Sequence, residues 1–364
     1  MQSSFSRHGH FHSLKFIFHA SCFILLFTAP LFAASAPPAP IDYAPFVEIK
    51  KFEGHQDSVA SAQLSNDGKW LVTASADKTA RIWNAQTGDL VKELKGHDDK
   101  LNTACFNKDA TQVLTASADK TARTWSVQTG KEVRKLTGHA DAVLCAAYSA
   151  DGLAIATASA DKTARIWNSY SGTMQKKITD HTAAVRAVSF HPTGSDILTC
   201  SDDMSAMEFS VTTGQADHIL QGKPLGFSSA VFTPDGKTVL TVCSDKLVRQ
   251  WDLAANTNPH GVRAKGCEPL TACLSPDGKT LLVTAKDNDL RLYDFASGNP
   301  VVTLKGHTAQ VTSASFSKDG KSIVSSSQDK TARLWSLPAP VPAAGAGTPP
   351  TPTSMPPAPA PPAP

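Results

Sequence analysis

Short apolar runs rich in β-branched and aromatic residues alternate with turns along this chain of 364 residues. Such alternation is typical of β-strands joined by tight turns. One set of turns reads Asn66-Asp67-Gly68-Lys69 and Pro234-Asp235-Gly236-Lys237, and another reads Gln86-Thr87-Gly88. Glycine suits both sets because it adopts positive φ at no steric cost. The pattern therefore predicts an all-β chain of short strands.

This pattern of strands and turns recurs with a fixed period of 42 residues. Aromatic residues occupy one place in the period, and an aspartate stands six positions before each of them. The aromatic residues are Trp83, Trp125, Trp167, Phe209, Trp251, Tyr293 and Trp335, and the aspartates are Asp77, Asp119, Asp161, Asp203, Asp245, Asp287 and Asp329. The turns and the Ala-Asp-Lys-Thr corner divide each period into four strands, which make one propeller blade. Seven periods thus predict a seven-bladed β-propeller over residues 45–337.

The two ends of this region complement each other. The segment Val47–Phe52 matches the fourth strands expected at Leu90–Leu94 and Glu132–Leu136, whereas residues 308–337 supply only three strands. We therefore expect the N-terminal strand to complete the last blade, which would leave no unpaired inner edge in the ring.

The segments on either side of the repeats have different compositions. Arg7 and Lys15 precede an apolar run from Phe16 to Phe32 that ends in small residues, which predicts a secretory signal peptide over residues 1–36. An uncleaved membrane anchor is the alternative, although Pro30 interrupts the short run. Residues 37–44 form a Pro-rich linker, and the uncharged Pro/Ala-rich residues 338–364 are expected to be a disordered tail. A cleaved leader places the protein in the periplasm or outside the cell, with no membrane span in the mature chain.

Charge and cysteine content narrow the range of functions. The formal net charge is +3, and no basic cluster indicates nucleic-acid binding. No zinc-ligand spacing or glycine-rich phosphate loop occurs, so no metal or cofactor is expected. The six cysteines after the leader are Cys105, Cys145, Cys200, Cys243, Cys267 and Cys273. Most fall at strand positions, which favours buried thiols, and disulfides in an exported protein are the alternative.

A third phase of the period carries His55, His97, His139, His181 and His307, with Lys223 and Lys265 in the two other places. The combination of Gly-His, Ser-x-Asp and Lys-Thr-x-Arg-hydrophobic-Trp resembles the WD-repeat (beta-transducin-like) family of propellers over residues 45–337. The export signal and the lack of an Asn-x-Ser/Thr sequon favour a bacterial exported member.

This resemblance implies a hydrogen-bonded tetrad of His, Ser or Thr, Asp and Trp in each complete blade. Carried over by position, the tetrads are His55, Ser75, Asp77 and Trp83; His97, Ser117, Asp119 and Trp125; His139, Ser159, Asp161 and Trp167; and His307, Ser327, Asp329 and Trp335. Three units depart from this pattern: the fourth has Phe209 for the indole, and the next two have Lys223 and Lys265 for His, with Cys243 and Ala285 for Ser. We expect those three blades to be the least rigid.

The function expected from this pattern is binding. A nucleophilic triad needs one activated hydroxyl in one pocket, so a His-Ser-Asp trio repeated around a ring predicts a structural network and no enzyme. In the family, the rim that carries the histidines is the usual partner-binding face. The positions transferred to that rim are Lys100, Asn102, Leu144, Arg186, Asp202, Glu268, Leu270, Lys286, Gln310 and Gln328.

These residues include no Trp or Tyr, which predicts a polar surface of modest affinity. The resemblance therefore implies a monomeric, non-catalytic scaffold for a protein or peptide partner. A propeller enzyme or cofactor-binding protein is one alternative, and a carbohydrate or cell-wall binding module is another.

Overall fold

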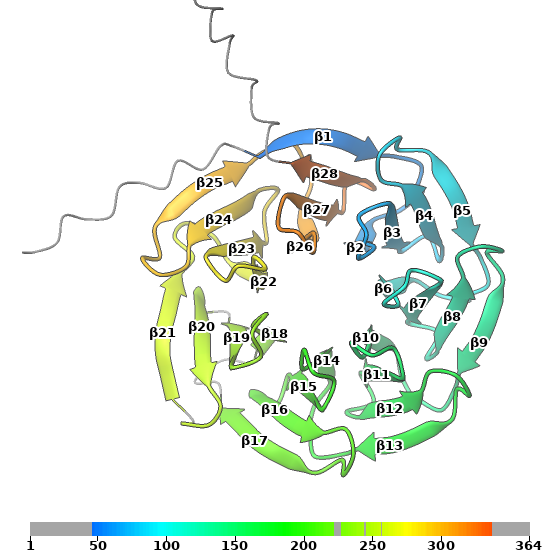
Figure 1. Cartoon of the computed structure of the whole chain (residues 1–364), viewed down its shortest axis with the longest axis horizontal. Coiled ribbons are helices and arrows are strands. Elements are labelled where there is room, and N and C mark those ends of the chain that lie inside the picture. The colour runs from blue at the N-terminus through cyan, green and yellow to red at the C-terminus, as the bar shows by residue number, and fades with distance from the viewer. Residues whose placement is uncertain (1–45, 222–226, 244, 256, 337–364) are drawn as a thin grey trace, which may run out of the picture. The chain divides into compact units, whose positions relative to one another are not determined.

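The computed structural model describes residues 46–221, 227–243, 245–255 and 257–336, and every regular element in these ranges is a β-strand. Seven four-stranded antiparallel sheets follow one another around a ring, as Figure 1 shows. The prediction of an all-β, seven-bladed propeller is confirmed. The expected signal peptide (residues 1–36), linker (37–44) and tail (338–364) lie outside the described residues.

Each blade runs from an inner strand to an outer strand in chain order. Blade 1 has β2 (Val59–Leu64), β3 (Trp70–Ser75), β4 (Ala80–Asn84) and β5 (Leu90–Leu94). Blade 2 has β6 (Leu101–Phe106), β7 (Gln112–Ser117), β8 (Ala122–Ser126) and β9 (Glu132–Leu136). Blade 3 has β10 (Val143–Tyr148), β11 (Ala154–Ser159), β12 (Ala164–Asn168) and β13 (Met174–Ile178). Blade 4 has β14 (Val185–Phe190), β15 (Asp196–Ser201), β16 (Ser205–Ser210) and β17 (Ala216–Gln221).

The remaining blades follow the same plan. Blade 5 has β18 (Phe227–Phe232), β19 (Thr238–Cys243), β20 (Leu247–Asp252) and β21 (Thr257–Arg263). Blade 6 has β22 (Pro269–Leu274), β23 (Thr280–Ala285), β24 (Leu290–Asp294) and β25 (Pro300–Leu304). Blade 7 has β26 (Val311–Phe316), β27 (Ser322–Ser327) and β28 (Ala332–Ser336), and its outer strand is β1 (Val47–Phe52).

The ring closes through β1, as expected from the sequence. This strand pairs antiparallel with β28, with Phe52 opposite Ala332 (Figure 1). The Phe52 side chain is 2% exposed and belongs to a core cluster that also contains Leu71 and Trp83 of blade 1. An ion pair between Glu48 and Arg333 joins the same two strands. The first and last parts of the described chain therefore share one sheet and one core.

The apolar core lies between neighbouring blades. Val72 and Ile82 of blade 1 pack in one buried cluster with Leu101 and Trp125 of blade 2. The second strands are buried along almost their whole length because a blade covers each of their faces, whereas an outer strand such as β9 is mostly exposed. This explains why the second strands read as continuous runs of Val, Leu, Ile, Ala and Thr.

The blades have two kinds of ends, which we name by the residues that form them. The histidine rim consists of the loops that enter each inner strand, such as residues 95–100, and the corners that follow each second strand, such as residues 118–121. The opposite rim consists of the turns after the first and third strands, such as residues 65–69 and 85–89. Most residues that the sequence marked as functional lie on or beneath the histidine rim.

Candidate functional site

A buried relay of hydrogen bonds links three parts of blade 2. The Trp125 indole Nε1 lies 2.8 Å from Thr115 Oγ1, which lies 2.8 Å from His97 Nε2, and His97 Nδ1 lies 2.6 Å from Asp119 Oδ2. Burial, which outweighs the opposing hydrogen bond with Asp119, lowers the pKa of His97, so the imidazole is neutral. Nδ1–H then donates to Asp119, and Nε2 accepts from the Thr115 hydroxyl, which in turn accepts the indole N–H. Every polar group in the relay thereby has a partner.

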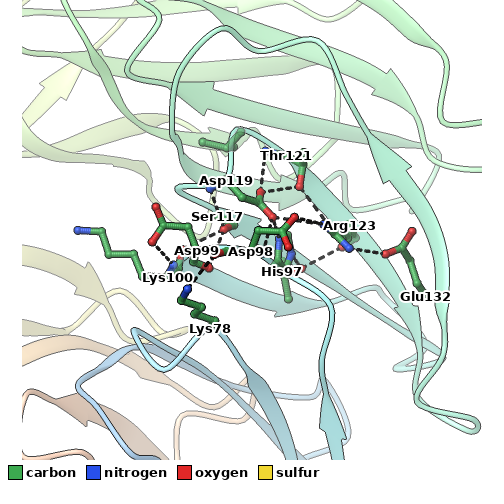
Figure 2. Close-up of polar contacts among 12 residues, drawn as sticks. Lys78, His97, Asp98, Asp99, Lys100, Ser117, Asp119, Thr121, Arg123 and Glu132 are labelled. Atoms are coloured by element: carbon green, nitrogen blue, oxygen red, sulfur yellow. Dashed lines mark hydrogen bonds and ion pairs between the residues drawn. The ribbon is translucent and has the colours of Figure 1, made fainter.

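The aspartate at the end of this relay joins the entry loop to the corner (Figure 2). Its Oδ1 accepts from the Thr121 N–H and hydroxyl at 3.0 and 2.6 Å, and its Oδ2 accepts from the Asp98 N–H at 3.2 Å. Burial alone would raise the pKa of Asp119, but the hydrogen bonds from Thr121 and His97 outweigh it and hold the pKa at about 2. A permanent carboxylate therefore fixes both loop segments of the histidine rim in this blade.

The same relay recurs in blades 1, 3, 4 and 7. Its hydroxyl and histidine pairs there are Thr73 with His55, Thr157 with His139, Thr199 with His181, and Ser325 with His307, each at 2.8 Å. In blade 4 the indole is replaced by Phe209, which has no N–H, and the relay begins at Thr199. The buried ring there still packs edge-on against His181.

The relay hydroxyl is two residues away from the expected serine. Ser117 accepts the Asp119 backbone N–H at 3.0 Å and donates to the Asp99 carbonyl at 3.0 Å, so it stabilises the corner without bonding to any side chain of the relay. The strand register explains the difference, because Trp125 lies opposite Val113 and reaches diagonally to Thr115. Ser117 is farther along the strand by about 7 Å. The expected tetrad members Ser75, Ser117, Ser159 and Ser327 are therefore corrected to Thr73, Thr115, Thr157 and Ser325.

The order Thr115, His97 and Asp119 matches that of a nucleophilic triad, and so do the distances. Burial prevents this chemistry, because Thr115 is 0% exposed and its oxygen already accepts the Trp125 indole. A nucleophile must reach a substrate carbonyl beside oxyanion donors, and a hydroxyl sealed inside a blade cannot. The relay is therefore a structural device.

Blades 5 and 6 hold their corner aspartates differently. In blade 5 Asp245 forms an ion pair with Arg249, and in blade 6 Asp287 receives two hydrogen bonds from Arg291 at 2.9 and 2.8 Å. Blade 6 also has Val283 at the relay hydroxyl position. In blade 2 the corner aspartate has both His97 and Arg123 as partners, at 2.6 and 3.3 Å, whereas in blades 5 and 6 the arginine is its cationic partner and Lys265, at the histidine position, is exposed. Lys223, the corresponding residue of blade 5, lies outside the described residues.

A β-bulge occurs at the same place in every blade, where the inner strand leaves the histidine rim. The pairing of the first and second strands skips one residue between Leu101 and Thr103, and at the corresponding place in the six other blades. The skipped residues are Ala60, Asn102, Leu144, Arg186, Ser228, Leu270 and Thr312. A bulge re-aims the side chain of the extra residue. Four of the candidate partner-binding residues, Asn102, Leu144, Arg186 and Leu270, therefore occupy special backbone positions.

Some bulge residues connect neighbouring blades. Asn102 Nδ2 donates to the Val143 carbonyl at 2.7 Å, and Thr312 Oγ1 donates to the Val59 carbonyl at 2.6 Å. These acceptors lie at the start of the next inner strand. Asn102 is thus engaged in the fold, and it is a weaker candidate for partner binding than the sequence suggested.

The structure brings six of the ten candidates together in three pairs on the rim. Arg186 forms a bidentate ion pair with Asp202, with closest N–O distances of 2.9 and 2.6 Å, and Lys286 pairs with Glu268 at 2.9 Å. The Gln328 N–H donates to the Gln310 carbonyl at 2.9 Å. Of the other candidates, Lys100 is exposed, whereas Leu144 and Leu270 are half-buried. The rim therefore presents preformed polar pairs fixed at rigid positions.

The cysteines are free thiols, so the disulfide alternative does not hold for the six that follow the leader. The thiols of Cys105 and Cys145 donate to carbonyls of Ala146 and Val188 in the next blade, at 3.7 and 3.6 Å. Burial raises the pKa of Cys105 and of Cys200 to about 12, which makes both unreactive at neutral pH.

The described residues contain neither a metal-binding cluster nor a membrane-spanning helix. No group of three or more His, Cys, Asp and Glu side chains could hold a metal ion in the part of the chain that the structure describes. No helix long and apolar enough to span a bilayer occurs in those ranges.

Comparison with known families agrees with this geometry. The family model "WD domain, G-beta repeat" matches residues 46–84, 88–126, 130–168, 172–209, 214–252 and 298–336, which together make up more than half of the chain. The chain belongs to the WD-repeat family. The unmatched residues 253–297 include β22, β23 and β24 of blade 6, the blade in which Val283 and Tyr293 replace the relay residues. The structure therefore has one more WD-repeat blade than the family model detects.

The similar curated proteins match only a short part of this WD-repeat chain. Notchless protein homolog from Arabidopsis thaliana is 48% identical over 42 residues, which are 12% of this chain and 9% of that protein. Ribosome biogenesis protein BOP1 homolog from Drosophila erecta is 40% identical over 57 residues, which are 15% of this chain and 7% of that protein. The matched segments thus span less than a tenth of these relatives.

The relay predicts a large difference between two threonines of blade 2. Replacing Thr115 with Val leaves the His97 and Trp125 nitrogens without partners in a buried site, so urea unfolding should show a loss of about 2 to 5 kcal/mol. Thr124→Val is the matched control, because Thr124 is 0% exposed and its hydroxyl has no hydrogen-bond partner among the described residues. It should leave stability unchanged or raise it. Equal losses in both variants would contradict the relay.

Acid should destabilise the propeller in two steps. Burial outweighs the neighbouring carboxylates and lowers the pKa of His97, His139 and His307 below 6.5, so only the unfolded chain takes up these protons as the pH falls through 6.5. Asp119 and Asp329, with pKa values held at about 2, add a second loss below pH 3.8. Urea unfolding at successive pH values should therefore show that the free energy of unfolding falls as the pH is lowered. In the His97→Asn variant this fall should be less steep in the first step. A stability that rises on acidification would refute the assignment of neutral imidazoles.

Proposed function

We propose that this WD-repeat protein is a non-catalytic scaffold that binds a protein or peptide partner on its histidine rim. The observation that carries the proposal is the division of polar groups between interior and surface. The relay groups that have the order of a nucleophilic triad, such as His97 and Thr115, are buried and satisfied within their blades. The pairs Arg186 with Asp202 and Lys286 with Glu268 are exposed on the rim. Such a surface suits recognition.

The rim favours specificity over high affinity. Its side chains project from β-bulges and from corners that are held by the relay in blades 1 to 4 and 7 and by aspartate–arginine pairs in blades 5 and 6. A partner therefore meets a preformed surface, and little ordering entropy opposes binding. Against this, a partner must compete with pairs that already exist, and surface pairs are each worth about 1 kcal/mol or less. None of the ten candidates is a Trp or Tyr, the residues that dominate strong interfaces.

The alternative functions have less support. An enzyme or cofactor-binding propeller would need polar groups converging on a cavity. The cavity between blades 5 and 6, of about 180 Å³, lies at the opposite rim, and its described lining includes no His or Cys. Its carboxylates, Asp235 and Asp277, already accept hydrogen bonds from Thr233 and Ser275 within their own turns. A carbohydrate module would use exposed aromatic rings. Among the described residues Tyr170, 67% exposed, is the only strongly exposed aromatic, and it lies on the opposite rim.

We further propose that the scaffold works in the periplasm or outside a bacterial cell. The basis is the leader at residues 1–36, in which Arg7 and Lys15 precede the apolar run. The relative named for ribosome biogenesis does not argue against this placement, because a match of 57 residues is little longer than one 42-residue repeat. Such a match reflects the shared blade and carries no information on the process.

Site-specific crosslinking tests the binding face. A photoreactive residue at Lys100 or Gln328, both exposed on the histidine rim, should yield crosslinks to a specific protein when the full chain is expressed in its own cells. The same residue at Lys69 or Lys321, exposed on the opposite rim, serves as the control and should yield none. Crosslinks confined to the opposite rim, or absent from both rims, would refute the proposal.

Cell fractionation tests the compartment. The full chain should appear outside the cytoplasm with a mass lowered by removal of its leader, because the apolar run directs export. Deleting residues 16–32 should retain the protein inside at its unprocessed mass. A full-length chain found in the cytoplasm would refute export and leave the binding proposal intact.

A further inference from the structure

We infer that the histidine rim of blades 5 and 6 recognises an acidic segment of the partner protein. The inference rests on the proposed function and specifies the chemistry of the partner. The residues that carry it are Lys246, Arg263, Lys265 and Lys286, which we call the basic cluster. All four are exposed. Lys246 and Lys286 lie in the corners of blades 5 and 6, Arg263 is the last residue of β21, and Lys265 lies in the chain that joins the two blades.

The basic cluster is continuous across the two blades. The Lys246 carbonyl accepts the Ala264 N–H at 2.9 Å, so the corner of blade 5 adjoins the segment that carries Arg263 and Lys265. Glu268 pairs with Lys286 of the blade 6 corner, and Lys286 and Lys246 both lower the Glu268 pKa. One carboxylate therefore lies within electrostatic reach of cations from both corners.

The acids around the cluster are already occupied. Asp245 is paired with Arg249, and Asp287 with Arg291, which also lies 3.8 Å from Asp289. Among the described residues of this region, Glu268 is thus the carboxylate that remains for the four cations. In these blades each corner aspartate is paired with its own arginine, and the histidine position of blade 6 carries the exposed Lys265 instead of a buried imidazole, so cations outnumber the free carboxylates in this region.

The histidine rim of blade 2, which has a complete relay, differs in its charge. Asp98 and Asp99 alternate there with Lys78 and Lys100, as Figure 2 shows, and the Lys78 ammonium donates to the Asp98 carbonyl at 2.9 Å. The histidine position is buried, so it adds no charge to the surface. The histidine rim is consequently of mixed sign at blade 2 and predominantly positive at blades 5 and 6.

The charge distribution favours a carboxylate-rich peptide over a nucleic acid. The Lys286–Glu268 pair is 60% and 50% exposed, so a carboxylate of a partner can replace Glu268 at small cost. Nucleic-acid surfaces combine cations with aromatic side chains that stack on bases. The described residues of the cluster include no such ring, and the net charge of the whole chain is only +3.

Fluorescence anisotropy with the full chain and a labelled peptide of alternating Glu and Ser tests the inference. Replacing both Lys246 and Lys265 with Glu should weaken binding by about tenfold or more, whereas Glu268→Gln should strengthen it by a few fold. The matched control replaces Lys237 and Lys279 with Glu. These lysines are exposed in opposite-rim turns of the same two blades, so the net charge changes equally. The control should bind within about twofold of the unmodified chain.

Three results would overturn the inference. The first is that both double variants weaken binding equally, and the second is that the acidic peptide does not bind. The third is that a single-stranded oligonucleotide of the same charge binds equally tightly and that this binding is lost in the Lys246 and Lys265 variant. The crosslinking at Lys100 and Gln328 reports separately on the proposed function. Crosslinks at the histidine rim that persist in the Lys246 and Lys265 variant would refute the acidic preference and leave the rim as the binding face.

Discussion

The structure depends on one constraint: an indole N–H and an imidazole buried between blades must each have a hydrogen-bond partner. Leaving either one unpaired would cost about 1 to 3 kcal/mol, a large share of the stability of a domain. The relay from Trp125 through Thr115 and His97 to Asp119 satisfies both groups and ends on a carboxylate. Because that carboxylate also binds the entry loop and the corner, satisfying the interior fixes the surface above it.

This coupling gives the histidine rim, the proposed binding face, an ordered backbone. The corner residue Lys120 is held at a φ of 70°, a conformation that costs energy for a residue with a side chain. The Asp119 carboxylate stabilises that corner through Thr121. The bulge residue Arg186 lies near the start of its inner strand, where it forms an ion pair with Asp202. Side chains on this rim therefore project from backbone that the interior has already positioned.

Periodicity was sufficient to predict the fold, because a strict repeat of 42 residues is compatible with few architectures. The match between Val47–Phe52 and later outer strands also predicted that the N-terminal strand closes the ring. Periodicity alone was insufficient to identify the hydroxyl group that takes part in the relay. Thr115 and Ser117 lie on the same face of one strand, and only the pairing of Trp125 with Val113 selects between them. The rim positions were predicted by position within the repeat, but their partners were not. Asn102 and Arg186 occupy equivalent bulges, yet Asn102 bonds to the next blade and Arg186 to a corner residue of its own blade.

Blade 6 illustrates the effect of removing the constraint. With Val283 and Tyr293 at the relay positions, no buried imidazole has to be satisfied, and the aspartate that would have held it binds Arg291. Lys265, which occupies the histidine position of this blade, is exposed. The corner changes as well, since Asn288 does not adopt the positive φ that Lys120 has in blade 2. The same substitutions that remove the link between interior and rim in this blade thus also place a cation, Lys265, at the rim.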